Sequence, residues 1–161
     1  MREPGAAPRR RMTSPSPNPD TVLSTLPIIP SVDEIPKVAE WLDLLAEQDD
    51  WPPALGFGLN LSVEEALANV ISHGFEKFDS PPQIRLEYLR LPAGEIAIRV
   101  VDNGRPFDPT AIQSPEMAES VEGAKIGGHG VRLMRHFLSS ISYARVGEEN
   151  QLTLVAAKKS A

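Results

Sequence analysis

Apolar residues recur at helical spacing between positions 59 and 71, and this stripe constrains the fold more than any other feature. In a helix each residue advances by about 100°, so residues spaced by three or four share one face. The apolar face holds Leu59, Val63, Ala66, Leu67, Val70 and Ile71. A polar line lies beside it and holds Ser62, Glu65, Asn69 and His73. We therefore expect a helix that buries one face and carries the polar line along the border of the core.

Glu65 and Asn69 place a carboxylate and an amide one helical turn apart at that border. Such a pair is suited to polarising a nucleophile or to holding a hard cation through oxygen, the ligand type that magnesium prefers. The same spacing is also typical of solvated neighbours on surface helices, which contribute only a few tenths of a kcal/mol, on the order of 0.2–0.5. The pair alone leaves both interpretations open.

Alternating apolar and polar residues predict four strands in the rest of the chain. Segments 83–91 and 95–101 have the spacing of an antiparallel hairpin, and segments 141–146 and 152–158 form a second pair around a turn at 147–150. With helices expected elsewhere, the pattern predicts an α+β sandwich in which helices pack on one face of a mainly antiparallel sheet.

An earlier helix is expected to begin at Asp33 as N-cap, with Pro36 in its first turn, and to run to about Glu47. Ser31 with Glu34 forms a competing capping box. That start would push Pro36 beyond the first turn, where proline is tolerated, so Asp33 is the preferred start.

Residues 1–20 are rich in Pro, Ser, Arg and Gly and have almost no large apolar side chains. Such a segment cannot offset the entropy of ordering, so we expect a disordered extension at 1–20 and one domain at 21–161. Segment 22–29 is a possible first strand, which Pro27 places at a sheet edge or ends early.

Charge and composition exclude several classes of function. The net charge is −6, distributed as +2 in residues 1–20 and −8 in residues 21–161. An acidic body argues against direct nucleic-acid binding. The absence of cysteine excludes thiol chemistry. No stretch approaches the roughly 18 apolar residues of a membrane span, and no apolar segment follows the arginines at 9–11, so we expect a soluble, cytoplasmic protein.

The strand at 96–101 runs directly into Asp102-Asn103-Gly104. A carboxylate at a strand end is suited to accept a hydrogen bond from an exocyclic amine such as that of adenine, and Gly104 would let a flat ring approach the backbone. Asp-Asn-Gly is equally typical of a plain turn.

The stretch between Asn103 and Gly130 shows little regular pattern, which is typical of a lid, a binding loop or a disordered insert. It closes at 125–130 with Lys-Ile-Gly-Gly-His-Gly, directly before a short expected helix at 131–138. Glycines before a helix N-terminus expose N–H groups to an anion, so this is a phosphate-site candidate, although a flexible hinge has the same composition.

Taken in order, the three segments resemble the gyrase and histidine-kinase type of ATPase, the GHKL superfamily, over about residues 31–158. The forms Glu65-Ala-Leu-Ala-Asn69, Asp102-Asn-Gly104 and Gly127-Gly-His-Gly130 look most like the stand-alone anti-sigma factor serine/threonine kinases. The resemblance implies a Bergerat-type ATP-binding sandwich, with a mainly antiparallel, mixed β-sheet and helices packed on one face.

The resemblance also implies roles for individual residues. Asn69 would coordinate Mg²⁺ that bridges the ATP phosphates, and Glu65 would act as general base toward a serine or threonine hydroxyl. Asp102 would accept a hydrogen bond from the adenine amine, with Gly104 near the ring. The remaining implied contacts are Gly128 and Gly130 on the phosphate side and Thr153 near the adenine.

By the same resemblance, the protein would be an ATP-dependent kinase and anti-sigma factor of a partner-switching system. It would phosphorylate a STAS-type antagonist, sequester a sigma factor or another regulator, and form a homodimer. Two alternatives remain at this point. One is a non-catalytic ATP-binding regulatory module that docks protein partners, and the other is a scaffold that binds no nucleotide.

Overall fold

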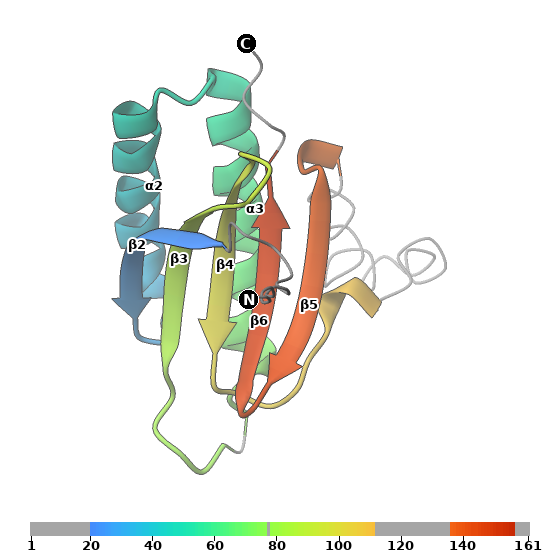
Figure 1. Ribbon diagram of the computed structural model, residues 1–161. Helices are drawn as coiled ribbons and strands as arrows, with labels where there is room; N and C mark the ends of the chain where they lie inside the picture. Colours follow the sequence, from blue (N-terminus) through green and yellow to red (C-terminus); the bar gives the residue numbers. More distant parts are fainter. Residues whose placement is uncertain (1–19, 77, 112–135, 157–161) are drawn as a thin grey trace, which may run out of the picture.

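The computed structural model describes residues 20–76, 78–111 and 136–156, and its centre is one five-stranded sheet (Figure 1). Every neighbouring pair of strands in this sheet is antiparallel. In spatial order the strands are β2 (Thr21–Ile28), β3 (Ile84–Arg90), β4 (Ile96–Asp102), β6 (Glu149–Val155) and β5 (Ser140–Val146). The predicted α+β class is confirmed, and the described strands form an antiparallel sheet where a mixed one was expected.

Two helices, α2 (Ile35–Asp49) and α3 (Pro53–His73), cover the same face of the sheet (Figure 1). Two short 3-10 turns, η1 (Val32–Glu34) and η2 (Pro109–Ala111), complete the described elements. Pro53 opens α3 at its first turn, where the missing N–H would have had no partner within the helix.

The apolar stripe of α3 forms the centre of the core. Leu59, Val63 and Leu67 are all fully buried. They belong to one cluster with alternate residues of three strands, namely Leu86, Ile98 and Leu154. The apolar face of α3 and the inward-facing residues of the strands therefore form one apolar layer, as the sequence predicted.

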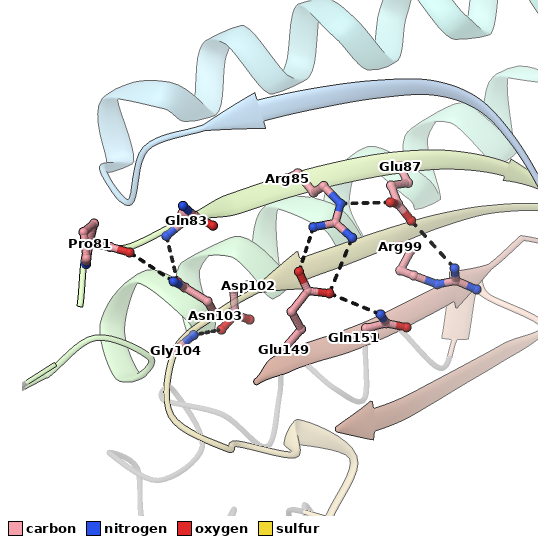
Figure 2. Close-up of polar contacts among 10 residues, drawn as sticks. All are labelled: Pro81, Gln83, Arg85, Glu87, Arg99, Asp102, Asn103, Gly104, Glu149 and Gln151. Carbon is pink, nitrogen blue, oxygen red and sulfur yellow. Dashed lines mark hydrogen bonds and ion pairs between the residues drawn. The ribbon is translucent and has the colours of Figure 1, made fainter. Parts of the chain in front are cut away.

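The opposite face of the sheet carries charged side chains, and neither α2 nor α3 covers it (Figures 1 and 2). Arg85 on β3 donates to Glu87 Oε2 and to Glu149 Oε2, each at 2.9 Å. Arg99 on β4 lies 3.7 Å from Glu87 Oε1. Alternate side chains of β3 and β4 thus face the core on one side and, on the other, a face that carries these ion pairs together with a small buried apolar cluster of Leu89, Ala97 and Val155.

The start of the first helix differs from the predicted one. Ser31, rather than Asp33, caps the 3-10 turn that precedes the α-helix, because its hydroxyl accepts from the backbone N–H of Asp33 at 3.1 Å. The 3-10 turn η1 follows, and the α-helix begins only at Ile35. This extra turn keeps Pro36 within the first α-helical turn, which resolves the conflict that had favoured Asp33.

The turn of the last hairpin is shorter than predicted. The turn consists of Gly147 and Glu148, with Gly147 at φ +60°, and β6 begins at Glu149. A two-residue hairpin turn needs a positive φ, which glycine adopts without strain. The predicted turn at 147–150 assigned Asn150 to the loop, whereas the structure places it in the strand.

Some predictions fall on parts of the chain that the structure leaves undescribed. Residues 1–19 of the expected extension, Gly128 and Gly130 of the glycine loop, and most of the expected lid and of the helix at 131–138 lie outside the described residues. Within the described ranges, no helix combines the length and the apolar character needed to cross a membrane.

A buried polar contact joins the end of the helical layer to the sheet. Trp51, between α2 and α3, donates its indole N–H to the hydroxyl of Tyr88 on β3 at 3.1 Å, and this hydroxyl donates to Asp49. Burial, followed by the bond to Asp49, raises the pKa of Tyr88 to about 12, so the phenol stays protonated. The link fixes the α2–α3 connection against β3.

Tyr88→Phe tests this link. The change leaves the buried Trp51 N–H without its acceptor, so we expect a loss of about 1–3 kcal/mol in the free energy of unfolding. Urea denaturation followed by tryptophan fluorescence would show a lower midpoint at an unchanged slope. An unchanged midpoint would contradict a stabilising role for the contact.

Candidate active site

Two of the predicted site residues meet in a narrow cavity between the second half of α3 and the end of β4. Its volume is about 20 Å³, room for roughly one water molecule. It is lined by Ala66, Asn69, Val70, Gly74, Asp102, Phe107, Pro109, Tyr143, Asn150 and Leu152. Two of these, Asn69 and Asp102, are predicted binding residues, and they reach the cavity from separate elements.

Asp102 is the last residue of β4, and only 4% of its surface is exposed. Its Oδ1 accepts from the backbone N–H of Gly104 at 2.8 Å and from the amide of Asn150 at 2.9 Å (the first is drawn in Figure 2). Burial raises the pKa of Asp102, and these two bonds together with the charge of Arg145 partly oppose that effect. Both bonds go to Oδ1, so Oδ2 is the oxygen suited to accept from a ligand.

Asn150 is a site residue that sequence reasoning missed. It lies opposite Asp102 in the pairing of β4 with β6. Its amide group also donates to the carbonyl of Arg105 at 2.7 Å, and its Oδ1 accepts from Tyr143 and from Arg145. Both donors and the acceptor of this buried side chain are thus in use, which holds Asp102 and the following turn in one arrangement.

Gly104 lies against the end of α3. A Cβ added there would sit 2.5 Å from the carbonyl oxygen of Gly74 and 3.0 Å from Asp102 Oδ1. Arg105 donates its N–H to the same Gly74 oxygen at 2.9 Å, and Arg145 donates to the Gly104 carbonyl at 2.8 Å. The position therefore requires glycine because of close backbone approach, in addition to any ligand contact.

Asn103 lies between Asp102 and Gly104 and anchors the turn to the segment that precedes β3. Its side-chain oxygen accepts from the N–H of Gln83 at 2.8 Å, and its amide donates to the carbonyl of Pro81 at 3.0 Å (Figure 2). The tripeptide is thus a turn, as one interpretation of the sequence held. The turn also orients the buried carboxylate of Asp102, and the other interpretation, acceptance of a hydrogen bond from an exocyclic amine, stays a prediction.

Asn69 and Glu65 come from α3, one turn apart. Asn69 is only 5% exposed, and its Nδ2 has no hydrogen-bond partner among the described residues. Glu65 is half-buried; burial raises the pKa of its carboxyl group, and the charge of Glu64 raises it further. A buried amide with unused hydrogen-bonding capacity and a carboxylate with raised proton affinity are typical of a functional site.

One side of the cavity is lined by Phe107, which stacks on a second ring outside the cavity. The ring of His73, on the last turn of α3, stacks on Phe107 with the centroids 5.2 Å apart and an angle of 29° between the planes. Phe107 lines the cavity next to Asp102. The wall beside the buried carboxylate is therefore apolar and flat, which suits a heteroaromatic ring.

Thr153 does not reach this cavity. Its hydroxyl accepts from Arg99 Nε at 3.1 Å, on the polar outer face of the sheet. Its neighbours Leu152 and Leu154 point into the core, and side chains alternate along a strand. The prediction for Thr153 is therefore corrected, and Asn150 is the β6 residue beside Asp102.

The side-chain chemistry of the cavity fits ATP with magnesium, while the cavity as it stands has room for about one water molecule. A buried acceptor carboxylate suits an adenine amine. Asn69 is buried with its Nδ2 unpartnered among the described residues, and its side-chain oxygen is the atom that would bind Mg²⁺, which uses one or two protein oxygens together with waters and substrate phosphates.

The fold and the cavity define a nucleotide-binding sandwich in which one helix and one strand end supply the polar groups. The sequence matches the family described as the histidine kinase-like ATPase domain over residues 29–156, which is most of the chain. The chain therefore belongs to the histidine kinase-like ATPase family. ATP binding follows from membership, and the family resemblance drawn from the three motifs is confirmed.

Two known proteins are similar to this chain. BtrW of Bordetella bronchiseptica, a serine/threonine-protein kinase, is 43% identical over 116 residues, which cover 72% of this chain and 80% of BtrW. The histidine kinase domain of the Erythrobacter litoralis EL346 blue-light activated histidine kinase aligns with a TM-score of 0.48 and 16% identity. That alignment covers 78% of this chain and 59% of the other. The prediction of a kinase of this superfamily is confirmed by the family match and BtrW.

Asp102→Asn tests the burial of the carboxylate. Folding raises the pKa of this carboxyl group. Its contribution to stability is therefore fully present below the ordinary pKa of about 3.9 and is lost as pH rises through the raised pKa. Asparagine keeps the Oδ1 acceptor and carries no charge. We expect wild type and variant to unfold alike near pH 4 and the variant to be more stable at pH 7, measured by urea denaturation across this range. Equal stability at both pH values would contradict the effect.

Gly104→Ala tests the close approach of the turn to α3. The added methyl group meets a backbone oxygen that cannot rotate away, so we expect a loss of about 1–3 kcal/mol in unfolding free energy. Gly56→Ala is the matched control, because there the nearest atom to a Cβ is 3.8 Å away and the position is helical. Thermal melts that moved equally for both variants would contradict the steric argument.

Proposed function

We propose that the protein is an ATP-dependent serine/threonine protein kinase, with Glu65 as the base. The observation that carries the proposal is the arrangement on α3, where half-buried Glu65 stands one turn from buried Asn69 and Asn69 shares a cavity with Asp102. The 43% identity to a protein named as a serine/threonine-protein kinase supports the choice of acceptor.

Asp102 and the turn behind it would orient the nucleotide. Asp102 Oδ2 would accept from the exocyclic amine of adenine, with Asn150 and Gly104 holding Oδ1 in place. Guanine carries a carbonyl at the corresponding position, which would meet the carboxylate with repulsion, so the site would prefer adenine. Asn69 would hold Mg²⁺, which supplies charge neutralisation on the phosphates when bound.

Glu65 would then receive the proton of the acceptor hydroxyl. The serine or threonine oxygen forms a bond to the γ-phosphorus, the bond between this phosphorus and the bridging oxygen of ADP breaks, and the hydroxyl proton moves to the Glu65 carboxylate. Burial, followed by the charge of Glu64, raises the pKa of Glu65, which strengthens its carboxylate as a proton acceptor. Rigid placement on a long helix aligns the two reactants.

The proposed partners follow from the motif forms. We expect the acceptor to be a STAS-type antagonist, and the unmodified antagonist to compete for this kinase with a sigma factor or another regulator. Phosphorylation of the antagonist would free the kinase to sequester that regulator. The kinase would act as a homodimer. These assignments rest on the resemblance of the three motifs to those of the stand-alone anti-sigma factor kinases.

Glu65→Gln tests the base. Glutamine preserves size and hydrogen bonding but accepts no proton, so we expect phosphoryl transfer to fall by a factor of about 10²–10⁴. Transfer of radiolabelled phosphate from ATP to a purified STAS-type protein of the same organism measures it. In the wild type the rate should decline toward acid pH as Glu65 takes up a proton, with a midpoint above the ordinary carboxyl value.

Binding of ATP serves as the control for this variant. Glu65→Gln should retain the rise in melting temperature that ATP with Mg²⁺ produces, since ligand at a hundredfold excess over Kd adds about 2.7 kcal/mol. Unchanged transfer in the variant would refute the role of Glu65. A wild-type protein that binds ATP and transfers nothing would instead be a non-catalytic regulatory module.

A further inference from the structure

A second cavity lies between the two helices, away from the nucleotide site. It forms a groove of about 430 Å³ between the last half of α2 and the first half of α3. Its lining residues are Asp43, Ala46, Trp51, Pro52, Pro53, Gly56, Phe57, Asn60, Leu61 and Glu64. None of them lines the nucleotide cavity, so the groove is a separate surface.

The groove has an aromatic residue at its edge and an apolar floor. Phe57 is 62% exposed and touches Phe137 edge to face with the ring centroids 5.6 Å apart. Trp51, held by its bond to Tyr88, forms part of the floor. A large exposed aromatic side chain beside a fixed apolar surface is typical of the anchor point of a protein interface.

The charge of the groove is of one sign. Asp43 on α2 and Glu64 on α3 line it from opposite helices, and the described residues that line it include no lysine or arginine. Two exposed acidic residues, Glu47 near the end of α2 and Asp50 directly after it, extend the negative charge beyond the groove. A segment that combines apolar side chains with lysine or arginine would match both the floor and the rims.

The position of the groove along α3 connects it to the catalytic residue. The α3 residues that line the nucleotide cavity, such as Ala66 and Asn69, follow Glu65 in sequence, and those that line the groove, from Pro53 to Glu64, precede it. At a rise of 1.5 Å per residue, the groove residues of α3 begin about 18 Å from Glu65 along the helix axis and end next to it at Glu64. The end of the groove at Glu64 is therefore the end nearest to Glu65.

We propose that the α2–α3 groove is the docking site of the protein substrate, and that the docked segment of the substrate is apolar and positively charged. The proposal rests on the proposed kinase function and adds the place and chemistry of substrate recognition. Apolar contact with Phe57 supplies affinity, and the pair Asp43 and Glu64 selects basic partners and accelerates their association.

A labelled peptide tests the groove directly. The probe is a fluorescein-labelled helical peptide of roughly 15 residues, with leucines at spacings of three and four on one face and lysines and arginines on the other. A second peptide replaces each basic residue by glutamate. Fluorescence polarisation with the full chain measures both, at low and at physiological ionic strength.

We expect the basic peptide to bind and the acidic one not to bind. Phe57→Ala and Glu64→Lys should each weaken binding of the basic peptide about tenfold or more. The matched controls are Leu44→Ala, an exposed apolar residue of α2 that is 51% exposed and outside the groove, and Glu40→Lys, an exposed acid outside it. Both controls should stay within about twofold, as is usual for surface substitutions.

Three results would overturn the proposal. They are equal weakening by the controls, equal binding of the acidic peptide, and binding that occurs only after residues 1–19 are removed, which would assign the groove to the chain's own arginine-bearing segment. The rise in melting temperature with ATP, measured on the same samples, shows whether the nucleotide site is intact, and so separates a wrong docking site from a wrong kinase assignment. A protein that binds ATP and transfers phosphate with the groove variants unimpaired loses only the docking site.

Discussion

Burial of the apolar stripe of α3 against the sheet is the interaction on which the rest of the structure depends. Leu59, Val63 and Leu67 pack with no exposed surface against Leu86, Ile98 and Leu154. Because packed interiors tolerate little change in shape, this contact sets the rotation of the helix about its axis. The polar line that borders the stripe is thereby held at the edge of the core, where Asn69 is buried and Glu65 is only half-buried.

The second constraint is the buried carboxylate at the end of β4. Folding removes Asp102 from water, which disfavours its charged form, and the neighbouring strand offsets only part of that effect through Asn150. A neutral residue would suit stability better at this position. We propose that the carboxylate is kept for the ligand whose amine it would accept, which is the usual reason for a locally unfavourable group in a functional site.

The helix α3 thus serves two sites from one rigid element. Residues after Glu65 line the nucleotide cavity, and residues before it line the acidic groove. In the proposed reaction, a phosphoryl donor and a protein acceptor need fixed positions relative to Glu65, and a single helix would supply them. The bond between Trp51 and Tyr88 ties the groove end of this helix to the sheet.

The sequence by itself determined the elements whose signals are local. The helical period of residues 59–71 predicted α3 and its polar border, and the alternation at 83–101 predicted the hairpin that ends at Asp102. Tertiary structure alone decided which β6 residue meets Asp102. Asn150 and Thr153 are three positions apart, an odd number, so they point to opposite faces of the sheet. Which of them faces the cavity beside Asp102 depends on the register of β6 against β4, two strands that are far apart in the sequence, and local periodicity does not encode that register.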